Sequence, residues 1–279
     1  MTDQRLAGRR ILVTGSTGIA AASARRFAAE GAAVFVVSRN AEHAQALADD
    51  VAAAGSPDAV GWLAADLTVA AEADRAIAAA VQGFGRIDGA FAVAGGSGRR
   101  WGDGRIHELS PDGWDMTLEL NLRTQALTCA AVVRQMLRQE PNGSGTRGAI
   151  LLMGSVTATD PAPRHFSTHA YAAAKGATIS LMRSMAATYV ADGIRVNAVA
   201  PGLTDTPMAT RAAGDTTIRS YARRRQPLAG ELMDPIEVAH AAVYLLSDES
   251  RAVTGQLLKV DGGWSLPPDT GPEIVGGTE

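Results

Sequence analysis

The feature that most constrains the fold of this chain is the regular alternation of short apolar runs with segments of helical length. Seven runs read as buried strands, near residues 10–14, 33–38, 59–64, 89–94, 148–154, 194–200 and 256–260. Alternation of this kind predicts right-handed strand–helix–strand crossovers and a sheet with helices on both faces. The expected fold is therefore α/β, with a doubly wound, mainly parallel sheet of seven strands.

The length and composition of the chain agree with one such domain. A chain of 279 residues with 46% hydrophobic content can bury one large core, and α/β folds of this size are commonly a single domain. We expect that domain over residues 1–265. The tail over 266–279 is rich in proline, glycine and acids, and it is expected to be irregular, either packed on a neighbouring subunit or without fixed structure.

Composition also limits the compartment and the partners. No apolar run is long enough to cross a bilayer, and the opening MTDQRLAGRR lacks the hydrophobic core of a signal peptide, so a cytoplasmic protein without a membrane partner is expected. The single cysteine, Cys129, is interpreted as a core residue rather than a nucleophile. A net charge of −3 gives no electrostatic case for nucleic-acid binding, and no metal site is expected.

A glycine-rich turn joins the first predicted strand to an alanine-rich helical segment. Glycines let the backbone turn tightly and approach a pyrophosphate, whose charge is met by free N–H groups and by the positive end of the helix dipole. A purely structural turn is the alternative, but the first strand–helix junction is the position that nucleotide binding requires. The expected cofactor contacts are Gly15, Ser16, Thr17, Gly18 and Ile19.

The end of the second predicted strand bears on the choice between NADP and NAD. Dinucleotide folds place an acid there to hold the adenosine 2′-hydroxyl, whereas this chain has Ser38, Arg39 and Asn40. A carboxylate would repel a 2′-phosphate, and a guanidinium binds one with paired, charge-assisted hydrogen bonds. We therefore expect NADP(H) in preference to NAD(H). The alternative is that Arg39 is a solvated loop residue.

Tyr171 and Lys175 lie one helical turn apart in the run HAYAAAKGA, so their side chains project from the same helix face. A nearby positive charge favours the phenolate, and we expect Lys175 to bring the pKa of Tyr171 towards neutral pH. Ser155 follows a buried strand and places a hydroxyl at the carboxyl end of that strand, where open α/β sheets bind their ligands. A turn or capping serine is the alternative for Ser155.

With these residues the chain resembles the short-chain dehydrogenase/reductase family, in its compact branch with a Tyr-x-x-x-Lys active site. The likeness runs from about Gly8 to Trp264. The resemblance implies that Tyr171 exchanges the substrate proton, that Lys175 lowers its pKa and holds the nicotinamide ribose, and that Ser155 hydrogen-bonds the reacting oxygen. It also implies that Asn121 supports a proton-relaying water, and that the protein is a homotetramer with contacts through helices around 111–138 and 170–191.

Further residues match family positions that line the cofactor. The resemblance implies contacts with the adenine, the nicotinamide and the neighbouring backbone from Asp66, Leu67, Ala94, Gly95, Pro201, Gly202, Thr204 and Thr206. Two positions depart from the family pattern. The glycine turn is one residue shorter than in the compact branch, which resembles the extended, sugar-nucleotide-modifying branch, and Ala92-Val93-Ala94-Gly95 replaces the common Asn-Asn-Ala-Gly.

Two segments that follow predicted strands are expected to govern substrate choice. One is Gly95–Arg105, and the other is Leu203–Gly230, which the resemblance makes a mobile lid. The second contains a group of arginines that would either attract an anionic substrate or form a solvated helix face. They are Arg219, Arg223, Arg224 and Arg225.

The sequence predicts an NADP(H)-dependent oxidoreductase that interconverts a small-molecule ketone and a secondary alcohol. Tyr171 carries the proton, and the cofactor carries the hydride. The spacing between Tyr171 and Lys175 argues against the related enoyl reductases, which usually separate these residues further. A 3-oxoacyl-thioester reductase is a narrower form of the same hypothesis. A sensor or scaffold that binds the dinucleotide without catalysis is the alternative from a different class.

Overall fold

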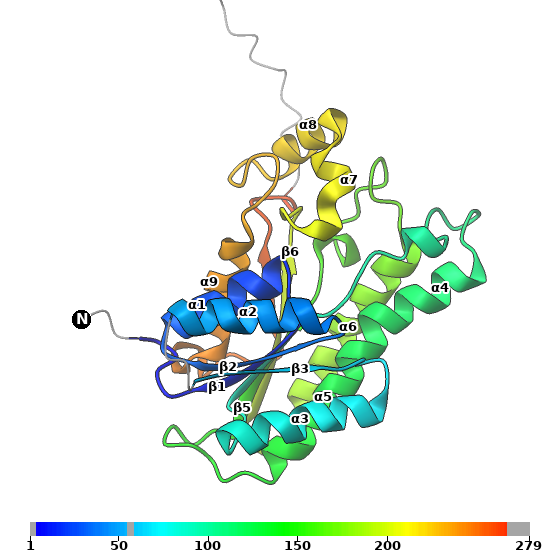
Figure 1. The fold of residues 1–279 in the computed structure, drawn as a ribbon. Helices are drawn as coiled ribbons and strands as arrows, with labels where there is room; N and C mark the ends of the chain where they lie inside the picture. The colour runs from blue at the N-terminus through cyan, green and yellow to red at the C-terminus, as the bar shows by residue number, and fades with distance from the viewer. Residues whose placement is uncertain (1–3, 55–58, 267–279) are drawn as a thin grey trace, which may run out of the picture.

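The structure is a computed structural model that describes residues 4–54 and 59–266. All strands of its seven-stranded sheet are parallel, in the order β3-β2-β1-β4-β5-β6-β7 (Figure 1). The strands are β1 (Arg10–Thr14), β2 (Ala33–Ser38), β3 (Val60–Ala64), β4 (Gly89–Ala92), β5 (Gly148–Met153), β6 (Ile194–Pro201) and β7 (Leu257–Val260). The predicted α/β fold is confirmed, and every strand lies close to its predicted position.

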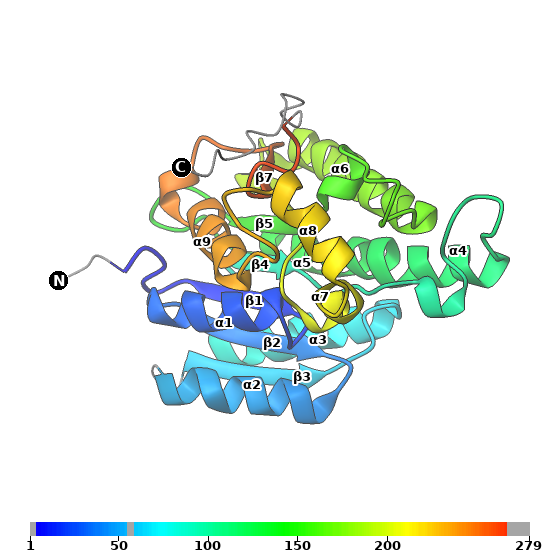
Figure 2. The same cartoon turned by 90° about the horizontal axis from the view of Figure 1, so that it is seen from above.

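Helices cover both faces of the sheet, as the view from above in Figure 2 shows. One face packs against α1 (Ile19–Ala29), α2 (Ala41–Ala54) and α9 (Pro235–Leu246), and the other against α3 (Ala70–Phe84), α5 (Thr124–Leu137) and α6 (His169–Tyr189). Successive residues of a strand point to opposite faces. Ile11 and Val13 therefore pack in the core on the α1 side, and Leu12 packs in the core on the α5 side. Cys129 is buried in the core on the α5 side, as expected.

The helical segment around 111–138 has an irregular centre. Helix α4 (Pro111–Leu118) continues through a π-helical turn, η3 (Glu119–Arg123), into α5. Asn121 lies in the middle of that turn and is completely buried. Single π-helical turns inside α-helices are frequent at functional sites, and this one sets Asn121 apart from an ordinary helical position.

The strand order reverses between β1 and β4, because β1 pairs with β2 on one side and with β4 on the other. Open α/β sheets bind ligands at the carboxyl ends of strands beside such a reversal. Here the Thr14 hydroxyl accepts a hydrogen bond from the Ala94 amide, at 3.0 Å, and thereby links the ends of β1 and β4. Val93 packs against the apolar core, so apolar contact takes the place of the missing asparagine side chains.

Two short helices, α7 (Thr210–Ala213) and α8 (Thr216–Arg225), stand beyond the carboxyl end of β6 (Figure 1). They belong to the segment that is expected to act as a lid. No helix in residues 4–54 or 59–266 is long and apolar enough to cross a membrane. Of the predicted tail, residues 267–279 lie outside the described residues.

Candidate active site

A cavity of about 800 Å³ opens at the carboxyl edge of the sheet, where the sequence places its candidate residues. Loops after β1, β2, β4, β5 and β6 contribute to its wall, together with α6. The predicted site residues that line it are Gly15, Ser16, Thr17, Gly18, Ile19, Arg39, Ala94, Gly95, Asn121, Ser155, Tyr171, Lys175, Pro201, Gly202, Thr204 and Thr206. Segments far apart in the sequence therefore meet at a single site.

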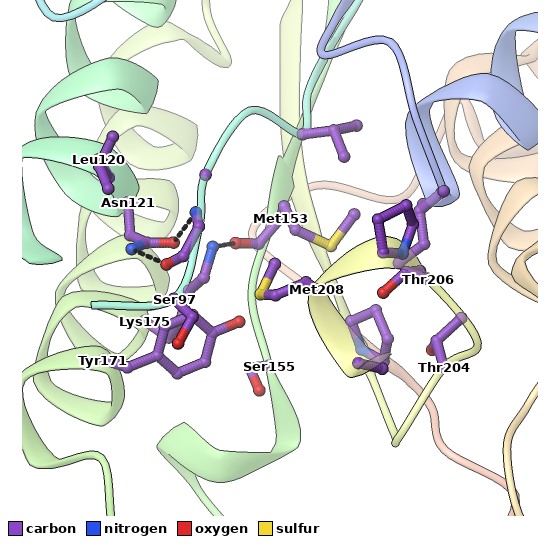
Figure 3. A pocket seen from close by; sticks show the side chains of 18 of the residues that line it. Ser97, Leu120, Asn121, Met153, Ser155, Tyr171, Lys175, Thr204, Thr206 and Met208 are labelled. Atoms are coloured by element: carbon purple, nitrogen blue, oxygen red, sulfur yellow. Dashed lines mark hydrogen bonds between the residues drawn. The ribbon is translucent and has the colours of Figure 1, made fainter. Parts of the chain in front are cut away.

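Tyr171 and Ser155 face the same part of this cavity from different elements. Tyr171 lies in the first turn of α6, and Ser155 lies two residues after the end of β5 (Figure 3). Ser155 also accepts a hydrogen bond from the Thr157 amide, at 3.2 Å, and so begins the short helix η4 (Val156–Ala158). The capping role foreseen as an alternative is therefore real, and it fixes the hydroxyl in place without removing it from the cavity.

Lys175 is buried beneath Tyr171, one turn further along α6. Its Nζ donates a hydrogen bond to the carbonyl oxygen of Met153, at 2.9 Å, and lies 5.5 Å from the centre of the Tyr171 ring (Figure 3). Gln125 donates to the same carbonyl at 3.1 Å, and its own carbonyl accepts from the Met153 amide at 2.9 Å. The last residue of β5 thus connects α5 with α6 and anchors the amine.

The pKa values of the pair differ from the expectation. Burial raises the pKa of Tyr171 to about 12, against a smaller opposing effect of the Ser155 hydroxyl, and burial lowers the pKa of Lys175 to about 7. The expected lowering of the Tyr171 pKa is therefore wrong for the protein alone. The loss of water disfavours the phenolate of Tyr171, and it also disfavours the protonated amine of Lys175 that would have stabilised this phenolate. Tyr171 consequently holds its proton at neutral pH.

Asn121 holds the loop after β4 against the helix. Its side-chain amide donates to the carbonyl oxygens of Gly96, at 2.8 Å, and Thr117, at 3.0 Å, while its oxygen accepts from the Gly96 amide, at 3.2 Å (Figure 3). A Cβ atom on Gly95 would lie 2.6 Å from that oxygen, so glycine is needed there. Gln125 supports the arrangement by donating to the Asn121 carbonyl oxygen at 2.9 Å.

The glycine turn keeps the features that a pyrophosphate requires, although it is one residue short. Gly15 and Gly18 have φ angles of 94° and 53°, which side-chain-bearing residues rarely adopt. In the described part of the chain, the amides of Ser16, Thr17 and Gly18 donate no hydrogen bond, and α1 has no side-chain cap. Free N–H groups at a helix N-terminus beside a large cavity fit an anionic dinucleotide.

The residues after β2 divide between the cavity and local structure. Arg39 is exposed at the cavity wall and forms no ion pair with another described residue. The Ser38 hydroxyl accepts a hydrogen bond from the Ser16 hydroxyl, at 2.9 Å, which brings the end of β2 to the glycine turn. Asn40 lies outside the cavity wall, and its side chain accepts from the amide of His43 at the start of α2.

Asp66 and Leu67 also lie outside the cavity wall. Leu67 is buried in the apolar core. Asp66 accepts hydrogen bonds from the Thr68 amide, at 3.0 Å, and the Thr68 hydroxyl, at 2.7 Å. The hydrogen bond from the amide contributes most to lowering the pKa of Asp66. Their assignment as cofactor contacts therefore remains a prediction, because the structure gives each of them a local role.

One residue that fixes Tyr171 was not among the predicted site residues. Asp103, in the loop after β4, is buried, and its carboxylate accepts from the amides of Ala170, at 3.0 Å, and Tyr171, at 3.1 Å. Thr168, the residue before α6, makes no side-chain cap. Asp103 thus caps α6 from 67 residues away in sequence, where a carboxylate also complements the helix dipole.

Three of the four arginines that the sequence places on α8 contact another side chain. Arg219 and Arg223 on α8 both contact the Glu231 carboxylate, at 3.5 and 2.6 Å. Arg225 lies over the ring of Trp264, at 5.4 Å. None of these arginines lines the large cavity, so the solvated helix face is the better description of α8.

The fold and the position of the cavity place the chain among the Rossmann-type α/β proteins, which bind dinucleotides at this edge of the sheet. A family model described as "Enoyl-(Acyl carrier protein) reductase" matches residues 13–265. The chain is 34% identical to 2,5-dichloro-2,5-cyclohexadiene-1,4-diol dehydrogenase of Sphingobium indicum, over 94% of this chain and 98% of that protein. It is 38% identical to cis-4-hydroxycyclohexanecarboxylate dehydrogenase of Sinomonas cyclohexanicum, with the same coverage.

A solved structure of a short-chain type dehydrogenase/reductase from Mycobacterium ulcerans is also similar. It aligns with a TM-score of 0.85 and 30% identity, over 94% of this chain and 92% of that one. The chain belongs to the short-chain dehydrogenase/reductase family, as its active-site residues indicated. It is therefore an oxidoreductase of a family that binds nicotinamide dinucleotides.

Proposed function

We propose that this enzyme uses NADP(H) to interconvert a ketone and a secondary alcohol, with Tyr171 as its general acid and base. One observation carries the proposal: Tyr171, Ser155 and Lys175 line the same cavity as the glycine turn with its free amides. The two named relatives support it, because both are called dehydrogenases of cyclic alcohols.

In the direction of reduction, each side chain has a defined task. The Ser155 hydroxyl donates a hydrogen bond to the substrate carbonyl oxygen, and Tyr171 transfers its phenolic proton to that oxygen. The bound cofactor supplies the hydride that the carbonyl carbon receives. Lys175 stabilises the resulting phenolate, and the new negative charge in turn favours the protonated amine. In oxidation the same proton returns to Tyr171.

The donor set around the glycine turn fits an anionic dinucleotide. The amides of Ser16, Thr17 and Gly18 would bind the pyrophosphate, and Arg39, with Ser38 beside it, would bind a 2′-phosphate. A Cβ atom on Gly18 would lie 2.8 Å from Cγ2 of Thr206, so Thr206 packs closely against the glycine turn. The absence of an acid at the end of β2 favours NADP(H) over NAD(H).

A panel of carbonyl compounds tests the reaction class. With NADPH, we expect saturated cyclic and linear ketones to be reduced to secondary alcohols, and the carbon–carbon double bond of an enone or a crotonyl thioester to remain intact. An acetoacetyl thioester would reveal the narrower 3-oxoacyl reductase. Product analysis by mass spectrometry distinguishes these outcomes, and exclusive reduction of double bonds would contradict the proposal.

The cofactor preference depends on Arg39. We expect Arg39→Asp to weaken NADPH binding by roughly tenfold or more, because a charge-assisted phosphate contact is lost and a repulsive carboxylate is added. NADH binding should change little or improve. Titration of intrinsic fluorescence gives both dissociation constants, and an unchanged preference would overturn the NADP assignment.

The remaining expectations concern the assembly and the cell. We infer a homotetramer and a cytoplasmic location from the family likeness, with one catalytic domain over residues 1–265. Exposed apolar side chains on the helices expected at the contacts support the assembly, namely Trp114, Leu137 and, at the end of α6, Val190.

A further inference from the structure

Two arginines meet at the large cavity, outside the set of residues assigned to catalysis. Arg99 comes from the short helix η2 (Arg99–Trp101) after β4, and Arg211 comes from α7. Each donates a hydrogen bond from Nη2 to the same acceptor, the carbonyl oxygen of His165, at 3.4 and 3.1 Å. His165 lies in the loop that connects Ser155 with Tyr171, and both arginines line the same cavity as the catalytic residues.

No carboxylate balances this pair. Among the described residues, neither Arg99 nor Arg211 forms an ion pair, and the cavity wall contains no aspartate or glutamate. The charge of Asp103 acts on Arg99, but the two carboxylate oxygens of Asp103 already accept hydrogen bonds from the amides at the start of α6. Burial and then the charge of Arg211 lower the pKa of Arg99, which means that the two guanidinium groups repel one another.

Two other arginines, one in η2 and one on α8, each contact another side chain. Arg223 contacts Glu231, and Arg100 stacks on the ring of Trp101 at 3.7 Å. Arg99 and Arg211 are both exposed, and Phe166 and Trp264, whose rings pack edge to face at 5.6 Å, add apolar surface to the same cavity wall. The cavity thus offers hydroxyl groups, apolar side chains and two arginines that meet at one carbonyl oxygen without a carboxylate partner.

We propose that the substrate carries a carboxylate, which Arg99 and Arg211 bind while Tyr171 and Ser155 hold the reacting oxygen. This inference rests on the proposed carbonyl reduction and names the substrate class for it, a keto acid or hydroxy acid with an apolar body. A carboxylate between the guanidinium groups replaces their mutual repulsion with charge-assisted hydrogen bonds to both.

A keto acid and its methyl ester provide a matched test, since they share the ketone and the ring and differ in the charge and one methyl group. With 4-oxocyclohexanecarboxylate and its ester as probes, we expect the wild-type enzyme to favour the acid in kcat/KM by roughly tenfold or more, the usual size of a charge-assisted contact. Arg211→Gln and Arg99→Gln should each remove most of that preference, measured as the ratio of kcat/KM for the acid to kcat/KM for the ester within each variant. Arg223→Gln, which removes the same charge from α8, should keep the preference.

A binding measurement separates this inference from the proposed reaction. Calorimetry of the NADPH-loaded enzyme with cyclohexanecarboxylate, and with its methyl ester as control, reports the arginine site without turnover. Binding of the acid that is lost in Arg211→Gln supports the site even where no ketone is reduced. Equal rates for acid and ester, with no effect of either arginine variant, overturn the inference and leave the ketone reductase intact. Preference for a phosphate or sulfonate ester over the carboxylate also overturns the proposed class.

Discussion

Tyr171→Phe is expected to lower kcat for ketone reduction by about 10²- to 10⁴-fold, the usual contribution of a positioned general acid. Phenylalanine keeps the ring that packs above Lys175, whose Nζ lies 5.5 Å from the ring centre, and removes only the transferable proton. The glycine turn and Arg39 are untouched, so the dissociation constant for NADPH should stay nearly the same. Steady-state kinetics and a fluorescence titration measure the two quantities.

Tyr189→Phe is the matched control, because Tyr189 ends the same helix, α6, and lies outside the cavity wall. It loses the same hydroxyl and should keep wild-type turnover. Equal activity in Tyr171→Phe would remove the proposed mechanism. A wild-type protein that binds NADPH tightly and reduces none of the carbonyl compounds would instead support the dinucleotide sensor.

Local patterns in the sequence were sufficient for the fold and for the centre of the site. The central residues of strands such as RILVT and GAILLM are apolar on both faces, because helices cover both sides of a parallel sheet. Each such strand can therefore be located from a single apolar run of residues. Tyr171 and Lys175 are one turn apart on a helix, and Ser155 follows a strand by two residues, so each is placed by its own element. These relations need no knowledge of distant contacts.

The features that escaped prediction depend on contacts between distant parts of the chain. Asp103 acts on α6 across 67 residues, and nothing near it in sequence indicates a cap. The meeting of Arg99 and Arg211 at one carbonyl likewise follows only from the folded arrangement of three loops. The raised pKa of Tyr171 was missed because the sequence shows the neighbouring lysine but not the depth at which both groups are buried. The role of Gln125 was also missed, but the sequence offered a signal for it, since Gln125 follows Asn121 by one helical turn.

The second large effect is expected from Gly113→Ala, on the far side of the loop that carries Asp103. A Cβ atom on Gly113 would lie 2.4 Å from the carbonyl carbon of Gly102 and 2.6 Å from the Asp103 amide nitrogen. Both are backbone atoms, so no side-chain rotation relieves the overlap, and the loop must move away from α4. We expect the free energy of unfolding to fall by about 1–3 kcal/mol or more, as overpacking usually costs. Chemical denaturation measures the change.

The same variant should also reduce catalysis, because the displaced loop weakens the hydrogen bonds that the Asp103 carboxylate accepts from the first turn of α6, at 3.0 and 3.1 Å. Gly83→Ala is the control: Gly83 lies in α3 with nothing within 4 Å of its added Cβ. It should keep full activity and gain up to about 1 kcal/mol of stability from the lower entropy of the unfolded chain. Lost stability with unchanged kcat in Gly113→Ala would show that Tyr171 is held in place without Asp103, and that α6 positions its catalytic residue by its own packing.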